Sequence, residues 1–139
     1  MSSGLYERGI KELASAESAP ASLPDPDRRV SVDNPFCGDR IDLEIDVEAG
    51  KVTALAQEVR ACMLCQAAAN AVAQSAIGLS SDEIEAARDS LRAMLQGEAN
   101  ADWTPPGWEP LALFEPVRSH KSRHGCVLLP FTALLKAMS

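Results

Sequence analysis

The fold of this protein is decided by one stretch of sequence, RIDLEIDV at residues 40–47. Aliphatic and polar residues alternate along it, so Ile41, Leu43, Ile45 and Val47 share one side. Because successive side chains of a strand point to opposite faces, this period of two predicts a β-strand with one apolar and one charged face. Such a strand belongs in an antiparallel sheet that is solvated on one side.

Two further strands are predicted beside it. Residues 29–33 alternate in the same way, and residues 52–59 follow after a short turn at 48–51. Gly50 supplies the positive φ that this turn needs. Strand, turn and strand with one apolar face indicate an antiparallel meander of three strands.

The rest of the chain is predicted to be helical. A short helix at 5–16 leads into a connecting arm at 15–26 that is rich in Ala, Ser and Pro. A helix at 61–77 ends before Gly78, and Ser80 with Glu83 forms a capping box for the next helix, which stops at Gly97. We expect a loop at 100–110, one or two helical turns at 111–117, and a last helix at 128–138 with Pro130 in its first turn.

Strands first and helices after predict an α+β fold, in which a small three-stranded antiparallel sheet is covered on one face by helices. The length of 139 residues suits a single domain. Within it, residues 1–33 hold the N-terminal helix, the connecting arm and the first strand. Residues 34–139 form the core that carries the cysteines.

Composition excludes several functions. The net charge of −7 argues against a nucleic-acid partner, which needs a basic face. The sequence has no run of about 18 apolar residues, so it predicts no membrane span. The first residues lack the layout of a secretory signal, so we expect a reducing cytoplasm. There, four cysteines are more typical of metal ligands or reactive thiols than of disulfides.

Three of the cysteines, Cys37, Cys62 and Cys126, lie at the edges of predicted elements. Helix N-termini and adjoining loops stabilise thiolates, so these three can form one site if the fold brings them together. Asp39 is the fourth candidate, since Gly38 lets both side chains emerge from one tight loop. Three sulfurs and one carboxylate suit zinc or iron.

Simpler interpretations compete with this one. A single cysteine is more often a small buried hydrophobic residue than a ligand. Cys62 and Cys65 form a lone Cys-x-x-Cys, which is a weak indication of a redox pair. A basic segment contains Arg118, His120, Lys121, Arg123 and His124. Most such segments are solvated loops, but positive charge just before Cys126 also favours its thiolate.

Three motifs give the chain a resemblance to a known family. The segment NPFCGD at 34–39 resembles the Asn-Pro-x-Cys-Gly-Asp motif of the U-type iron–sulfur cluster assembly scaffolds, the family of IscU, SufU and the NifU N-terminal domain. ACMLCQA at 61–67 resembles its Gly-Cys-x-x-Ser segment. RHGCVLLPF at 123–131 resembles its last-cysteine segment. The match runs from about Asn34 to the C-terminus.

The resemblance implies ligands or sulfur acceptors at Cys37, Cys62 and Cys126, with Asp39 beside them. It also implies a cysteine desulfurase as partner, downstream cluster carriers or apo-proteins as recipients, and zinc or a [2Fe–2S] cluster at the site. Cys126 is the expected sulfur acceptor. Such a protein is a scaffold or a sulfur-transfer protein, not an enzyme.

The chain departs from the family pattern at several positions. Ala61 stands where Gly is usual, Cys65 where Ser is usual, and Gly125 where the IscU branch has His. His124 and Cys65 are therefore auxiliary candidates for the site, although Cys65 can also be a resolving thiol or a packing residue. Arg123, three residues before Cys126, resembles a basic residue of the family and is a third auxiliary candidate. The long segment at 96–121 favours the SufU-like branch. Two other functions stay open: a structural zinc domain, and a thiol oxidoreductase that uses Cys62 and Cys65.

Overall fold

A computed structural model describes residues 8–35, 38–98 and 107–139. Its elements follow in chain order: α1 (Arg8–Ser15), β1 (Arg28–Asn34), β2 (Asp39–Glu48), β3 (Lys51–Arg60), α2 (Met63–Ser75), α3 (Ser81–Leu95), the 3₁₀ helices η2 (Glu109–Ser119) and η3 (Lys121–Arg123), and α4 (His124–Met138). The strands come first and most of the helices follow them, as the sequence predicts. The predicted positions 5–7 of the first helix lie outside the described residues.

The sheet has the order β1–β2–β3, with both pairs antiparallel. Ile41, Leu43 and Ile45 are buried as the alternation predicts. Val47 is only half-buried, since the register of β2 and β3 shifts between Asp46 and Val47. The hairpin closes through Ala49 and Gly50, whose φ angles of 54° and 78° are those of a tight two-residue turn. The predicted meander and α+β fold are confirmed.

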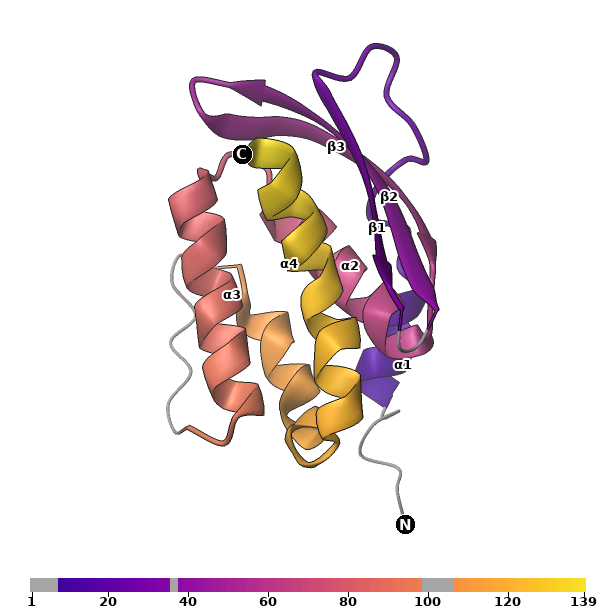
Figure 1. Ribbon diagram of the computed structural model, residues 1–139, viewed down its shortest axis with the longest axis vertical. Helices are drawn as coiled ribbons and strands as arrows, with labels where there is room; N and C mark the ends of the chain where they lie inside the picture. Colours follow the sequence, from indigo (N-terminus) through magenta and orange to yellow (C-terminus); the bar gives the residue numbers. More distant parts are fainter. Residues whose placement is uncertain (1–7, 36–37, 99–106) are drawn as a thin grey trace.

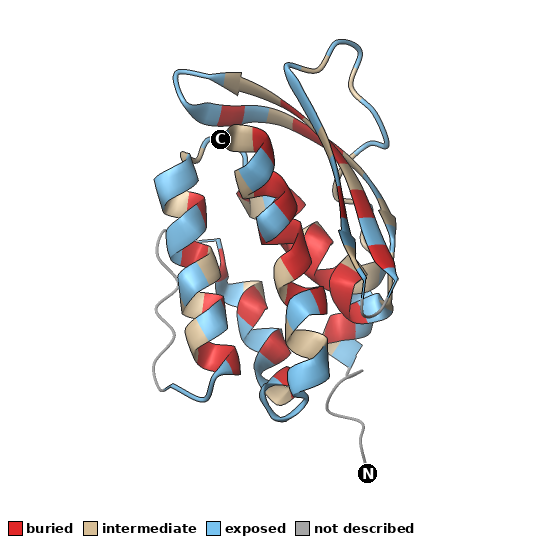
Figure 2. Cartoon of the chain, viewed as in Figure 1, coloured by how far each residue is buried: buried red, intermediate tan, exposed pale blue. Residues whose placement is uncertain are grey.

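The helices cover one face of this sheet (Figure 1). Helix α4 packs against β1 and β2, and α2 packs against β3. Helices α1 and α3 lie outside them, α1 on α2 and α3 on α4. Buried residues gather on the sides of α2 and α4 that face the sheet and the other helices (Figure 2). Phe131 and Trp108 are among the largest of them, with ring centroids 5.5 Å apart.

The connecting arm crosses the outer face of the sheet. Its Pro20 carbonyl accepts a hydrogen bond from Gln57 on β3, and its Leu23 amide donates to the Glu44 carboxylate on β2 at 2.8 Å. That bond, together with Arg29 at 2.9 Å, holds the pKa of Glu44 below its ordinary value. The arm thus covers part of the polar face of the sheet, which the sequence analysis predicts to be solvated.

Three helix predictions need correction. The last helix begins at His124, four residues earlier than predicted, so Pro130 lies in its interior. Proline cannot donate to the carbonyl four residues back, but eight residues of α4 are buried, and this burial sustains the helix. The predicted short turn at 111–117 is the longer η2, which starts at Glu109, inside the expected loop. Helix α2 is shorter than predicted and begins at Met63.

The capping box of α3 is confirmed. The Ser80 hydroxyl accepts from the Glu83 amide, and the Glu83 carboxylate accepts from the Ser80 amide at 3.0 Å. In the part of the chain that the structure describes, no helix is both long and apolar enough to cross a membrane.

Candidate metal centre

The register of β2 and β3 places the first two ligand candidates together. Arg40 lies opposite Arg60 in the sheet, so Asp39, one residue before Arg40, lies beside the link from β3 to α2. Cys62 is the N-cap of α2 in this link. Residues 23 positions apart in sequence are therefore neighbours because two strands pair in one register.

The Asp39 carboxylate contacts Cys62 through both of its oxygens. Its Oδ1 accepts from the Cys62 amide at 2.9 Å, and its Oδ2 lies 3.5 Å from Cys62 Sγ, which donates to it. Asp39 is 3% exposed and is the one buried charged residue in the described part of the chain. A buried carboxylate is stabilised by such hydrogen bonds and by the N-terminal end of the helix dipole.

Helix α4 brings the third candidate to the same place. Cys126 lies in the first turn of α4, which packs on β1 and β2, and its side chain is fully buried. One ligand atom from each of Asp39, Cys62 and Cys126 lies within 4.8 Å of the other two. Cys62 is more exposed than Cys126. Two thiols and a carboxylate from three separate elements thus converge at one end of the sheet.

The donor set fits a tetrahedral metal. Zinc bonds of about 2.3 Å to sulfur and about 2.0 Å to oxygen give a tetrahedral S···O edge of about 3.5 Å and an S···S edge of about 3.8 Å. The Sγ of Cys62 and the Oδ2 of Asp39 are already 3.5 Å apart. The three ligand atoms lie at most 4.8 Å apart, so the longest separation between two of them has to shorten by about 1 Å to match the S···S edge. Rotation of a side chain supplies a movement of this size. These residues can therefore bind a metal ion.

The other predicted site residues have different surroundings. Cys37 lies outside the described residues, so its place in the site stays a prediction. Cys65 is fully buried in the core and is not part of the three-residue group. His124 Nε2 lies 3.0 and 3.1 Å from the carbonyls of Val117 and Arg118. Because carbonyls only accept, this nitrogen carries a hydrogen and donates to them.

Arg123 is half-buried and ends η3. It immediately precedes α4, three residues before Cys126. Neither Arg123 nor His124 was placed in the ligand group by the geometry, and their auxiliary roles stay predictions.

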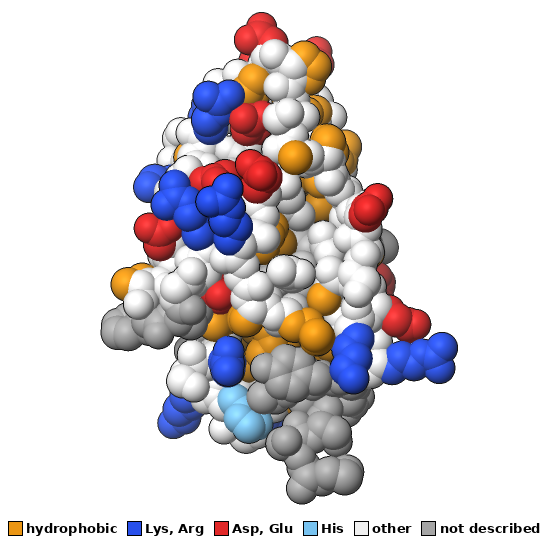
Figure 3. Space-filling view, turned by 90° about the vertical axis from the view of Figure 1, so that its right-hand side faces the viewer, with side chains coloured by type: hydrophobic (Ala, Val, Ile, Leu, Met, Phe, Trp, Pro, Cys, Tyr) orange, Lys and Arg blue, Asp and Glu red, His pale blue; other side chains and the backbone are white. Residues whose placement is uncertain are grey.

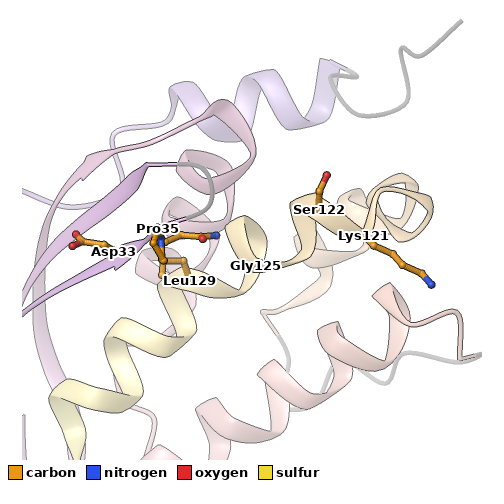
Figure 4. Close-up of a pocket in the computed structure, with 7 residues that line it drawn as sticks. Asp33, Pro35, Lys121, Ser122, Gly125 and Leu129 are labelled. Carbon is orange, nitrogen blue, oxygen red and sulfur yellow. The ribbon is translucent and has the colours of Figure 1, made fainter.

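A cavity of about 550 Å³ reaches Gly125, the residue before Cys126 (Figure 4). Its lining includes Asn34 and Pro35 from the end of β1, and Gly125 and Leu129 from α4. In Figure 4 the Lys121 side chain extends away from Gly125. Figure 3 shows hydrophobic side chains in the lower half of one face of the molecule, with Lys and Arg side chains on either side of them.

Sequence reasoning missed the contact between Asn34 and Gly125. A Cβ on Gly125 would lie 3.0 Å from Asn34 Nδ2, so the Asn34 side chain uses the space that a larger residue would fill. The Asn34 carbonyl also accepts from the Gly38 amide at 2.9 Å. Asn34 thus lies between Gly38, at the start of β2, and the first turn of α4, which contains Cys126. The glycine at 125 was the available signal.

Comparisons with solved structures show which proteins this fold is similar to. The chain is similar to the N-terminal part of a nitrogen-fixing NifU-like protein from Brucella abortus, with 33% identity, a TM-score of 0.90, and coverage of 98% of this chain and 93% of that one. It shares its fold with a putative iron–sulfur cluster assembly scaffold protein for the SUF system from Fervidobacterium islandicum AW-1. That likeness has 21% identity, a TM-score of 0.87, and full coverage of both chains.

No protein-family model matches the chain. No curated protein matches it either. The fold, the sheet order and the extent of the first structural likeness nevertheless define the class of this protein, a small α+β scaffold domain. The chain belongs to the U-type iron–sulfur cluster assembly scaffold family. Its assignment to the SufU-like branch stays a prediction.

Proposed function

We propose that this protein accepts sulfur from a cysteine desulfurase and binds a metal ion or a nascent [2Fe–2S] cluster at Cys37, Asp39, Cys62 and Cys126. The observation that carries the proposal is the convergence of Asp39, Cys62 and Cys126 within 4.8 Å. Membership in a family of iron–sulfur cluster assembly scaffolds supports it. Thiolates are ligands for zinc, iron and iron–sulfur clusters alike.

In the proposed transfer, a cysteine thiolate attacks the terminal sulfur of the desulfurase persulfide. The new S–S bond forms on the acceptor, the old S–S bond breaks, and the desulfurase cysteine leaves as a thiolate. No electrons are gained or lost overall. We assign the acceptor role to Cys126, whose side chain is fully buried, so the residues that cover it have to move before a partner reaches it.

The experiment mixes the protein with a cysteine desulfurase and cysteine under anaerobic conditions. The expected result is the added mass of one sulfur atom on the peptide that contains Cys126, and its loss in Cys126→Ser. Cys65→Ser is the matched control, since it removes a thiol that lies outside the ligand group. Unchanged sulfide release, together with no added sulfur on Cys126, contradicts the proposal.

The same donors also suit a structural zinc site with no desulfurase partner. Elemental analysis and a visible spectrum of anaerobically purified protein separate these two cases. A colourless protein with zinc favours sulfur transfer or a structural role, and the desulfurase experiment then decides between them. A brown protein with iron and labile sulfide favours cluster assembly.

A thiol oxidoreductase that uses Cys62 and Cys65 is the weakest candidate. Cys65 packs in the hydrophobic core and lies outside the group that Cys62 forms with Asp39 and Cys126. Such an enzyme loses its activity in Cys65→Ser, and a scaffold does not.

A further inference from the structure

A second cavity, of about 390 Å³, lies between the end of α3 and the start of α4. We call it the basic pocket and define it by its lining residues, Leu95, Gln96, Arg118, Lys121 and His124. Lys121 also lines the cavity of about 550 Å³ described above. The two cavities therefore both reach η3, and the side chain of Lys121 extends away from Gly125 (Figure 4).

The charge of the basic pocket is opposite to that of the whole chain. The chain carries a net charge of −7, but the described lining residues include two permanent cations and a histidine and no acidic residue. Glu115 pairs with Arg118 at 3.4 Å, and both side chains are half-exposed, 50% and 54%. An exposed pair of this kind contributes little, so another carboxylate can replace Glu115 at small cost.

The histidine holds the pocket in shape. Its Nε2 donates to the carbonyls of Val117 and Arg118, which ties the end of η2 to the first residue of α4. Arg118 and Lys121 thus belong to a short segment that this hydrogen bonding holds in place. Fixed groups lose less conformational entropy when they bind a partner.

The pocket includes a residue of the helical turn that carries the proposed sulfur acceptor. His124 and Cys126 belong to the same first turn of α4. A partner that contacts His124 and Lys121 therefore binds at the helical turn that contains Cys126.

We infer that the basic pocket is the docking site for acidic side chains on the protein that delivers sulfur to Cys126. This inference rests on the proposed function and names the chemistry of the partner surface. Carboxylates that face Arg118 and Lys121 accelerate association by electrostatic steering and fix the orientation of the complex. The negative charge of the rest of the chain repels the same acidic surface elsewhere, so steering selects this end of the molecule.

The test measures association with a cysteine desulfurase at low and at high salt. The double variant Arg118→Glu/Lys121→Glu reverses the pocket charge. The double variant Lys11→Glu/Lys136→Glu changes the net charge by the same amount, but at exposed positions on α1 and in the last turn of α4. Zinc binding, measured without desulfurase, reports whether each variant keeps the metal centre and the fold.

We expect the pocket variant to associate at least about 10-fold more slowly than the wild type at low salt, with a smaller dependence on salt. The control should stay within about 2-fold of the wild type. Equal association rates for the two double variants overturn the docking site. The proposed function is unaffected by that result if the wild type still gains sulfur from the desulfurase. If the wild type neither binds the desulfurase nor gains sulfur, the proposed function fails and the docking site fails with it.

Discussion

Zinc should stabilise this protein through Cys62 and Cys126 and not through Cys65. A ligand that binds only the folded state at 100 times its dissociation constant adds about 2.7 kcal/mol to the free energy of unfolding. The unfolding entropy of 139 residues near 60 °C is about 0.29 kcal/mol/K, from about 2.1 cal/mol/K per residue. The expected rise in Tm is therefore about 9 °C.

Removing one thiolate should abolish most of this rise. Loss of an outer-shell partner alone weakens metal sites by about 10- to 100-fold, so loss of a ligand costs at least about 100-fold. At the same zinc concentration the remaining stabilisation is about 0.4 kcal/mol, which corresponds to a shift of about 1 °C. We expect this for Cys62→Ser and for Cys126→Ser.

The assay is thermal unfolding of metal-free protein under reducing conditions, with and without zinc. Cys65→Ser is the control, because its thiol is buried in the core outside the ligand group. Its own Tm can fall, but the zinc-dependent increment should remain about 9 °C. A full increment in Cys126→Ser, or its loss in Cys65→Ser, would refute the assigned ligand set.

Three other predictions follow from burial and hydrogen bonding. A thiol reagent should label Cys62 before Cys126 in the metal-free protein, because Cys62 is half-buried and Cys126 fully buried; peptide mass analysis over time shows the order. Ser80→Ala should lower the free energy of unfolding by about 1 kcal/mol in urea titrations, since it removes half of the capping box, whereas Ala at the exposed Ser81 should not. The lowered pKa of Glu44 gives stability that is present above about pH 4.5 and is lost as the pH falls further, so Glu44→Gln should be less sensitive to acid over that range in thermal unfolding.

Much of the fold was predictable because its signals are local. The alternation at 40–47 depends only on the geometry of a strand, and it identified the buried side of β2 correctly. The capping box at Ser80 depends on three consecutive residues beyond it, and it placed the start of α3 correctly. The start of α4 was wrong, because the burial of its apolar side outweighs the local effect of Pro130.

The candidate metal centre was also predictable only in part. The sequence by itself determined which residues have metal-binding chemistry, since thiols and carboxylates are ligands wherever they lie. Only the tertiary structure decided which of them meet: strand register set Asp39 against Cys62, and the packing of α4 on the sheet added Cys126 while leaving Cys65 in the core. Contacts between residues far apart in sequence depend on how whole elements pack, and no short stretch of chain encodes that packing. The same holds for His124, which the end of η2 engages through its carbonyls, and for Gly125, whose missing side chain leaves room for Asn34.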